Sequence, residues 1–167
     1  MNLTEIDPDG SRGLEAMVDE PVERRECSIA NSLAVLGERW TFLVVREMLY
    51  GAHRFEQIAG YTGISRDILA VRLRTLQEHG VIEKRQYSEH PPRFEYHLTE
   101  SGRELLPVLL SLAKWGSKWA NGDSEPRPFM HSCGHRLDIA YSCVQCGEQL
   151  HAEDIEPAPQ GLDEALL

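Results

Sequence analysis

The pattern of apolar residues in the centre of the chain predicts an amphipathic helix with clear ends. Leu69, Leu73 and Leu76 recur at steps of four and three residues, which places them on one helix face. Ser65 is a favourable N-cap for this helix, and Gly80 suits the position just after a helix end. The sequence therefore predicts a helix with one buried face and one free face.

Further helices are predicted before this one. Residues 27–36 have a helical pattern that Gly37 interrupts. Residues 39–50 are apolar almost all round, which is typical of a helix buried inside its domain. A short helix follows around Glu56, and Gly63 permits a tight turn, including a left-handed one, before the central helix.

The residues after the central helix predict a two-stranded ribbon. Residues 81–87 and 93–98 have strand character, and residues 88–92 form the expected turn. Pro91 and Pro92 cannot donate a hydrogen bond to a strand ladder, so they belong at the tip of the ribbon. Apolar and polar side chains alternate along the second strand, as in a half-buried strand, in the order Phe94, Glu95, Tyr96, His97 and Leu98.

A last helix is predicted up to residue 119, with Thr99 as its N-cap. Its apolar stripe from Leu105 to Trp119, like the one around Leu33 and Leu36, is broader than one small domain needs to cover itself. We therefore expect a dimer interface there, and the alternative is packing within the monomer. Trp115 and Trp119 fit a core or a platform for a ligand equally well.

The net charge of −10 is distributed unevenly along the chain. Residues 1–23 carry −6, residues 24–120 carry +3 and residues 121–167 carry −7. Charges beyond ~8 Å are largely screened at physiological salt, so DNA responds to the field of the contacting face and not to the total charge. A net +3 is also ordinary for a solvated surface, and charge alone does not identify a DNA-binding protein.

The order of helix, turn, helix and charged ribbon is what a winged helix-turn-helix needs to place its second helix in the major groove of double-stranded DNA. The start and the free face of that helix offer Ser65, Arg66, Asp67 and Arg74 to the base edges. Contacts to phosphates or the minor groove are expected from Arg54, Arg72, Arg85, His90 and Arg93. The alternative for each Arg is a surface ion pair with Glu56, Glu78 or Glu95.

Several blocks in this region resemble one known family in the same order. They are Cys27, GERW at 37–40, RF at 54–55, GIS at 63–65, LRTLQEHGVIEK at 73–84 and HPPRFEYHLTESGREL at 90–105. With these blocks, residues 27–119 resemble the HxlR-type winged-helix transcription regulators, which are relatives of the MarR type. The resemblance implies a homodimer, built from the terminal helices, that binds a pseudo-palindromic operator as a repressor. A small-molecule or thiol-reactive effector is expected on the same ground.

Cys27 is the single cysteine of the main domain. Some members of the family sense thiol stress through a cysteine here, and the resemblance carries that redox role to Cys27. A reactive thiol needs partial exposure and a lowered pKa. Arg24 and Arg25 favour the thiolate, whereas Glu23 and Glu26 oppose it. The alternative, an inert half-buried cysteine, is the favoured interpretation.

The C-terminal part of the chain has the composition of a small metal site. Cys143 and Cys146 form a CxxCG pattern that is typical of a zinc knuckle, and Cys133 supplies a third thiolate. His131 and His135 are the two candidates for a fourth ligand. So small a segment buries little apolar area, so zinc would provide much of its folding energy. The alternative is a metal-free hairpin extension with reduced thiols.

The sequence thus predicts a mainly α fold with a small β-wing: a winged helix-turn-helix domain plus a small zinc-ribbon-like appendage. The expected segments are an acidic, disordered N-terminus at 1–23, the main domain at 24–120, a linker at 121–128, the appendage at 129–155 and an acidic tail at 156–167. With no apolar run of membrane length and no signal peptide, we expect a cytoplasmic protein. We find no catalytic motif and expect no enzyme. The competing class is a winged-helix module that docks other proteins without reading DNA.

Overall fold

The computed structural model describes residues 27–120 and 127–157. The predicted acidic N-terminal segment lies outside the described residues, as do residues 121–126 of the predicted linker and residues 158–167 of the predicted tail. None of the described helices is long and apolar enough to cross a membrane.

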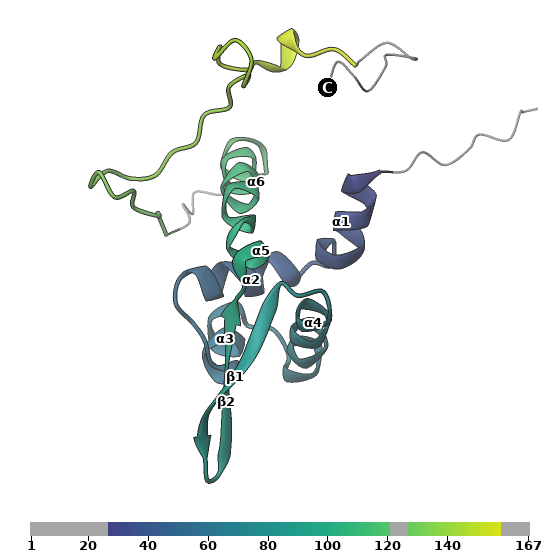
Figure 1. The fold of residues 1–167 in the computed structure, drawn as a ribbon, viewed down its shortest axis with the longest axis vertical. Helices are drawn as coiled ribbons and strands as arrows, with labels where there is room; N and C mark the ends of the chain where they lie inside the picture. The colour runs from purple at the N-terminus through teal and green to yellow at the C-terminus, as the bar shows by residue number, and fades with distance from the viewer. Residues whose placement is uncertain (1–26, 121–126, 158–167) are drawn as a thin grey trace, which may run out of the picture.

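The described elements follow the predicted order and form a mainly helical winged helix-turn-helix (Figure 1). They are α1 Ser28–Leu36, α2 Thr41–Leu49, α3 Phe55–Thr62, α4 Arg66–Glu78, β1 Ile82–Glu89, β2 Pro92–Leu98, α5 Glu100–Arg103 and α6 Leu105–Trp119, followed by a short 3-10 helix, Ala152–Asp154. β1 and β2 pair in an antiparallel two-stranded sheet, which is the wing. Figure 1 shows the wing projecting on one side of α2, with α1 and α6 on the other side.

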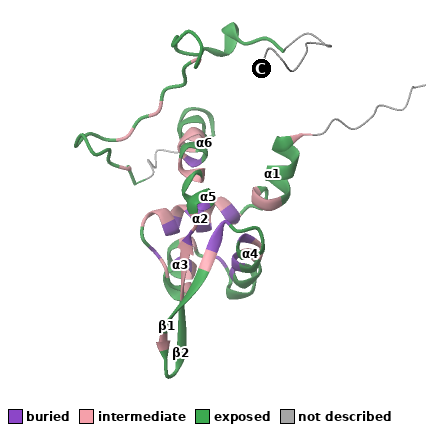
Figure 2. Ribbon diagram, viewed as in Figure 1, coloured by how far each residue is buried: buried purple, intermediate pink, exposed green. Residues whose placement is uncertain are grey.

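The core lies where α2, α3 and α4 meet the base of the wing (Figure 2). α2 buries Val44, Val45 and Met48, which confirms that it is the central helix of the domain. Ile58 of α3 and Ile82 of β1 are also buried against this cluster. Apolar burial of this kind fixes the helices that carry the candidate site.

The turn between α3 and α4 has the predicted geometry. Gly63 ends α3 with a φ of 69°, a left-handed conformation that side chains with a Cβ rarely adopt. The hydroxyl oxygen of Ser65 then accepts a hydrogen bond from the Ile68 amide at 3.4 Å, as an N-cap does. This turn determines the direction in which α4 leaves the core.

The wing is longer than the sequence predicted, and its turn is shorter. Glu89 pairs with Pro92, so the expected turn at residues 88–92 was wrong at both ends. Pro92 is tolerated as the first residue of an end strand, because its missing amide hydrogen need not face the partner. The register shifts between Gln86 and Ser88, which is a bulge at the outer half of the wing.

The predicted alternation of the second strand fades toward the wing tip. Leu98 is buried and Tyr96 is half-buried, but Phe94 is exposed. The reason is that the outer half of the wing extends beyond the helices, so neither face of the ribbon is covered there (Figure 2).

The predicted last helix is divided into α5 and α6 at Glu104. Pro107 lies in the first turn of α6, where its ring is incompatible with a continuous helix through the preceding turn. Thr99 caps α5 as predicted, since its hydroxyl oxygen accepts a hydrogen bond from the Gly102 amide at 3.3 Å.

The C-terminal segment, residues 127–157, contacts the winged helix at its first half. Tyr50 of α2 donates a hydrogen bond to the Arg127 carbonyl at 2.6 Å and stacks on Phe129 at 4.8 Å between ring centroids. Lys114 of α6 bonds the Asp138 carboxylate at 3.0 Å and the Ile139 carbonyl at 2.7 Å. The end of the predicted linker is thus in contact with the main domain.

Candidate DNA-binding surface

α4 has one packed face and one free face, as the sequence predicted. Leu69, Leu73 and Leu76 are buried against the core and hold the helix in place. The opposite face exposes Asp67 and Arg74. A helix fixed in this way can lie in a major groove without losing its own packing.

The free face also offers apolar groups that the sequence analysis did not select. Ala70 and Val71 are exposed beside Arg74, and 45% of Val71 is accessible. Methyl groups of this kind can contact the thymine methyl in the major groove. In the sequence, Ala70 and Val71 lie between the charged residues Asp67 and Arg72, and this position could have marked them as part of the free face.

Arg66 is tied to α3 and is exposed at the start of α4. Its guanidinium bonds the Glu56 carboxylate at 2.5 Å and lies over the Phe55 ring at 5.2 Å from the centroid. The hydrogen bond and the charge of Glu56 raise the pKa of Arg66. The predicted alternative, a surface ion pair, therefore exists at this position.

Arg72 and Arg74 lie only two positions apart on α4 but differ strongly in exposure. Arg74 is exposed, with no ion-pair or hydrogen-bond partner within the described residues. The side chain of Arg72 is only 17% exposed and faces Glu38 at 4.0 Å, and its Nε finds no hydrogen-bond partner in the described part of the chain. Arg74 is thus available to a base, whereas Arg72 is poorly placed for a phosphate.

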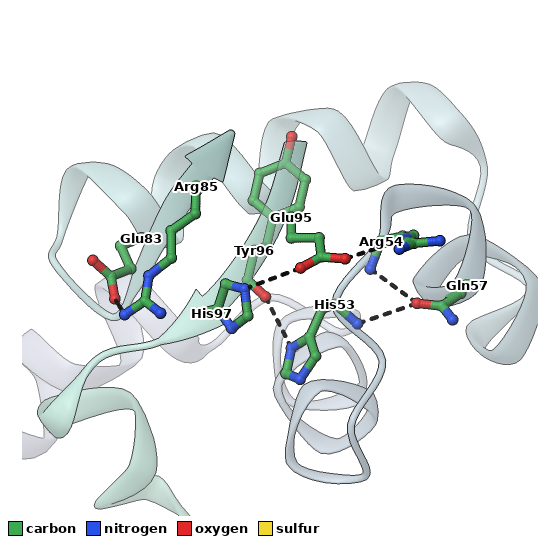
Figure 3. A network of polar contacts seen from close by, with 8 residues as sticks. All are labelled: His53, Arg54, Gln57, Glu83, Arg85, Glu95, Tyr96 and His97. Atoms are coloured by element: carbon green, nitrogen blue, oxygen red, sulfur yellow. Dashed lines mark hydrogen bonds and ion pairs between the residues drawn. The ribbon is translucent and has the colours of Figure 1, made fainter. Parts of the chain in front are cut away.

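The base of the wing is linked to the start of α3 by a polar network (Figure 3). Arg54 bonds the Glu95 carboxylate at 3.0 Å and lies over the Tyr87 ring at 4.6 Å. His97 lies 3.4 Å from the same carboxylate. The hydrogen bond from Arg54 holds the pKa of Glu95 below its usual range, against the opposing effect of partial burial. Arg54 therefore helps to position the wing, in addition to offering a positive charge to DNA.

Further contacts of His53 and Gln57 complete the junction between the wing and α3. The Tyr96 amide donates to the His53 carbonyl at 2.7 Å, and the His53 ring stacks on His97 at 4.4 Å. The Gln57 side chain accepts a hydrogen bond from the Arg54 amide at 3.1 Å. These contacts fix the angle between the wing and α3, and no sequence signal marked His53 or Gln57.

The wing carries the remaining predicted contact residues. Arg93 and His90 are exposed near the tip, and Arg85 is exposed with an ion pair to Glu83 (Figure 3). Lys84, which the sequence analysis did not select, is exposed with its ammonium 4.1 Å from the centroid of the Phe94 ring. The wing thus presents several cations that can meet a phosphate backbone.

The predicted redox residue lies at the other end of the domain. Cys27 is half-buried and immediately precedes α1. All four cysteines of the described residues are free thiols. The redox role of Cys27 stays a prediction.

The five predicted metal ligands are placed in two separate turns. His131 Nδ1 lies 3.1 Å from the Cys133 thiol in the first turn. In the second turn, hydrogen bonds from the Cys146 and Gln145 amides lower the pKa of the Cys143 thiol. Among the described residues, no three His, Cys, Asp or Glu side chains gather closely enough to hold a metal ion.

Comparison with known proteins settles the family. The model of the HxlR-like helix-turn-helix family matches residues 35–124. The chain belongs to the HxlR-like helix-turn-helix family. Among its relatives is the uncharacterised HTH-type transcriptional regulator Rv3095 of Mycobacterium tuberculosis H37Rv, which is 39% identical over 134 residues, 79% of this chain and 85% of the relative. A Synechocystis regulator, sll1512, is 41% identical over 59% of this chain and 73% of its own length.

Solved structures agree with this assignment. PA1607, a putative transcription factor, superposes with a TM-score of 0.69 at 31% identity and covers 81% of this chain and 96% of its own. The redox regulator HypR in its reduced form has a TM-score of 0.53 at 30% identity over 57% of this chain and 95% of its own. The HxlR-like chain described here is a DNA-binding transcriptional regulator, as its family, its fold and the free face of α4 all indicate.

Proposed function

We propose that the protein acts as a homodimeric repressor that reads a pseudo-palindromic operator with the free face of α4. The observation that carries this proposal is the contrast on α4 itself. Its leucines are locked in the core, while Arg74 is exposed and has no partner in the described residues. A free guanidinium on a rigid helix can make the bidentate contact that distinguishes guanine in the major groove.

The wing supplies the second half of the proposed contact. Lys84, Arg85 and Arg93 are exposed along it, and Figure 1 shows the wing beside α4 on the side away from α1 and α6. Cations on such a ribbon neutralise phosphates and release counterions, which makes binding depend on salt. Base reading is thus assigned to α4, and affinity without sequence preference is assigned to the wing.

The proposed dimer rests on two helices whose apolar sides are left exposed by the described part of the chain. α1 buries none of its residues, and Ile29 and Leu33 are 69% and 56% exposed. On α6 the exposed apolar residues recur at helical spacing, at Val108, Leu112, Trp115 and Trp119. Apolar helix faces of this extent are usually covered by a partner, and a second copy gives the two-fold symmetry that a palindrome needs.

Light scattering of the full chain tests the dimer. At low micromolar concentration we expect twice the chain mass of 18.9 kDa. Leu112→Asp should shift the protein toward the monomer, whereas Ser117→Asp, on the opposite face of α6, should leave the dimer intact. A wild-type mass near 18.9 kDa would contradict the proposal.

A cleft between α2, α6 and the C-terminal segment is the proposed effector site. Its volume is about 750 Å³, within the ~300–1,000 Å³ range of small-molecule pockets. Phe42, Leu109, Phe129 and Leu137 line it, with Lys114 and Arg136 at polar positions. An apolar ligand that fills it would press on α6, which is part of the proposed dimer interface. Such a ligand should raise the thermal unfolding midpoint of the wild type. Loss of this increase in Leu109→Trp, whose larger side chain fills the cleft, would support the site.

The competing function, docking of other proteins without DNA, predicts a different response to salt. A DNA-reading dimer should lose affinity for a duplex steeply as salt rises, because each phosphate contact releases a counterion. Fluorescence anisotropy of a labelled duplex at several salt concentrations measures this slope. Absence of duplex binding at low salt would favour the docking module.

A further inference from the structure

The C-terminal segment contains the same turn twice. The first copy, residues 130–136, is closed by an antiparallel bridge between Met130 and Arg136. The second copy, residues 142–149, is closed by a bridge between Ser142 and Gln149. The two copies differ in length by one residue, and both carry a glycine in the left-handed region near the end of the turn.

The backbone hydrogen bonds of the two turns correspond one by one. In the first turn, His131 N donates to the His135 carbonyl at 2.9 Å, and Gly134 N donates to the His131 carbonyl at 2.9 Å. In the second turn, the equivalent bonds are Cys143 N to the Glu148 carbonyl at 2.8 Å and Gly147 N to the Cys143 carbonyl at 2.7 Å.

This correspondence aligns the candidate ligands. His131 occupies the position of Cys143, because each opens its turn and accepts from the glycine amide. Cys133 occupies the position of Cys146, because each directly precedes that glycine. His135 then corresponds to Glu148, which lies outside the CxxC pair.

The side chains of the first pair are in contact. The Cys133 amide donates to His131 Nδ1 at 3.3 Å. The His131 Nδ1 and Cys133 Sγ atoms lie 3.1 Å apart. Two ligands of one tetrahedral zinc, at ~2.0 Å for nitrogen and ~2.3 Å for sulfur, are separated by about 3.5 Å. The first pair is therefore within about 0.4 Å of the spacing that one metal ion requires, and zinc would take the place of the Cys133 amide at the Nδ1 lone pair.

We propose that the two turns are the halves of one tetrahedral zinc site whose ligands are His131, Cys133, Cys143 and Cys146. His135 is not a ligand. In this structure the halves are apart, since no three such groups meet among the described residues. The five residues 137–141 connect the turns, and a connection of that length spans at most about 18 Å, so the halves are tethered within reach of each other.

The metal has a physical task in this segment. No residue from 127 to 157 is fully buried, so the turns lack a core of their own. Metal binding free energy becomes folding free energy in such a segment. Three thiolates and one imidazole are soft donors that suit zinc rather than magnesium or calcium. Four protein ligands close the site, so its role is structural.

Elemental analysis of the full chain, purified without chelator, tests the site first. We expect about one zinc per chain. A ratio near zero would overturn the proposal, because a closed site with three thiolates retains zinc through purification.

A matched pair of histidine variants tests the ligand set. His131→Ala should weaken zinc binding by more than the ~10–100-fold that loss of an outer contact costs, whereas His135→Ala should change it little. Competition with a chromophoric chelator measures both affinities. Equal losses, or a larger loss from His135→Ala, would overturn the assignment of His131.

Two further measurements separate loss of a ligand from loss of folding. His131→Cys should still bind one metal, and its cobalt form should show stronger thiolate-to-metal absorption than the wild type, because four thiolates replace three. Zinc added to the stripped wild type should protect residues 130–149 from hydrogen exchange and leave Leu69 to Leu76 unchanged. Failure of His131→Cys to bind, or no gain of protection, would count against the site.

Discussion

The winged helix and the C-terminal segment are stabilised in opposite ways. The winged helix has one apolar core, in which side chains from α2, α3, α4 and the wing base are buried. Residues 127–157 bury no side chain fully, and their contacts with the winged helix include the Tyr50–Phe129 stack and hydrogen bonds from Tyr50 and Lys114. The first region therefore positions its functional side chains by packing, together with polar contacts where α3 meets the wing. The second holds its candidate ligands in two local turns, which zinc would bring together under the proposal above.

Truncation of a buried side chain should have the largest effect on the free energy of unfolding, and this effect should differ between the two regions. Leu73→Ala removes a buried side chain of α4 and should lower the free energy of unfolding by ~2–5 kcal/mol. Leu137→Ala, at a half-buried position of the mostly exposed C-terminal segment, should cost less than about 1 kcal/mol. Urea unfolding of the main domain measures both, and similar losses would mean that the segment belongs to the same core.

DNA binding should depend on the winged helix. Within it, α4 should determine sequence preference, and the wing should contribute affinity for any sequence. Arg74→Ala should weaken binding to the operator by ~1–3 kcal/mol with a smaller effect on random DNA. Arg93→Ala should weaken binding to all sequences alike and reduce the salt slope. Anisotropy titrations on both duplexes give the comparison. Equal loss from Arg74→Ala on operator and random DNA would argue against base reading.

A smaller effect is expected at the start of α4. Ser65→Ala removes the oxygen that accepts from the Ile68 amide and should cost ~1 kcal/mol in stability. Ser65→Asp keeps a cap acceptor and serves as the control. Thermal unfolding of both variants measures the difference, and an unchanged midpoint for Ser65→Ala would show that the cap is dispensable.

The smallest effect concerns the attachment of the C-terminal segment. The hydrogen bond from Lys114 lowers the pKa of Asp138 below its ordinary value of 3.8. A lowered pKa in the folded state means that the contact contributes fully above pH 3.8 and is lost as the pH falls through the lowered pKa. Hydrogen exchange at Ile139 should therefore rise on acidification in the wild type, relative to Asp138→Asn. Identical pH profiles would show that this ion pair does not hold the segment.

The sequence predicted the elements of the main domain because apolar period and capping act locally. The positions of Leu69, Leu73 and Leu76, the turn at Gly63 and the cap at Ser65 all followed from neighbouring residues. The exposure of Phe94 did not follow, because alternation gives the two faces of a strand but not how far the sheet extends beyond the helices.

The candidate site was predicted less completely, because it depends on contacts between distant residues. The sequence assigned Arg74 to base edges and Arg72 to phosphates, but the packing of α4 leaves Arg72 facing Glu38. Spacing likewise leaves His131 and His135 as alternatives, and the backbone bonds of the two turns are the basis for proposing His131.

Selection of bound duplexes from random DNA by the full chain is the most direct test of the central claim. A homodimer that reads DNA with two copies of α4 should enrich a pseudo-palindrome whose half-sites are separated by about one helical turn, ~10 base pairs, or a multiple of it. Arg74→Ala should lose the enrichment at specific positions within each half-site. Enrichment of a single asymmetric site, or of no sequence at all, would contradict the account.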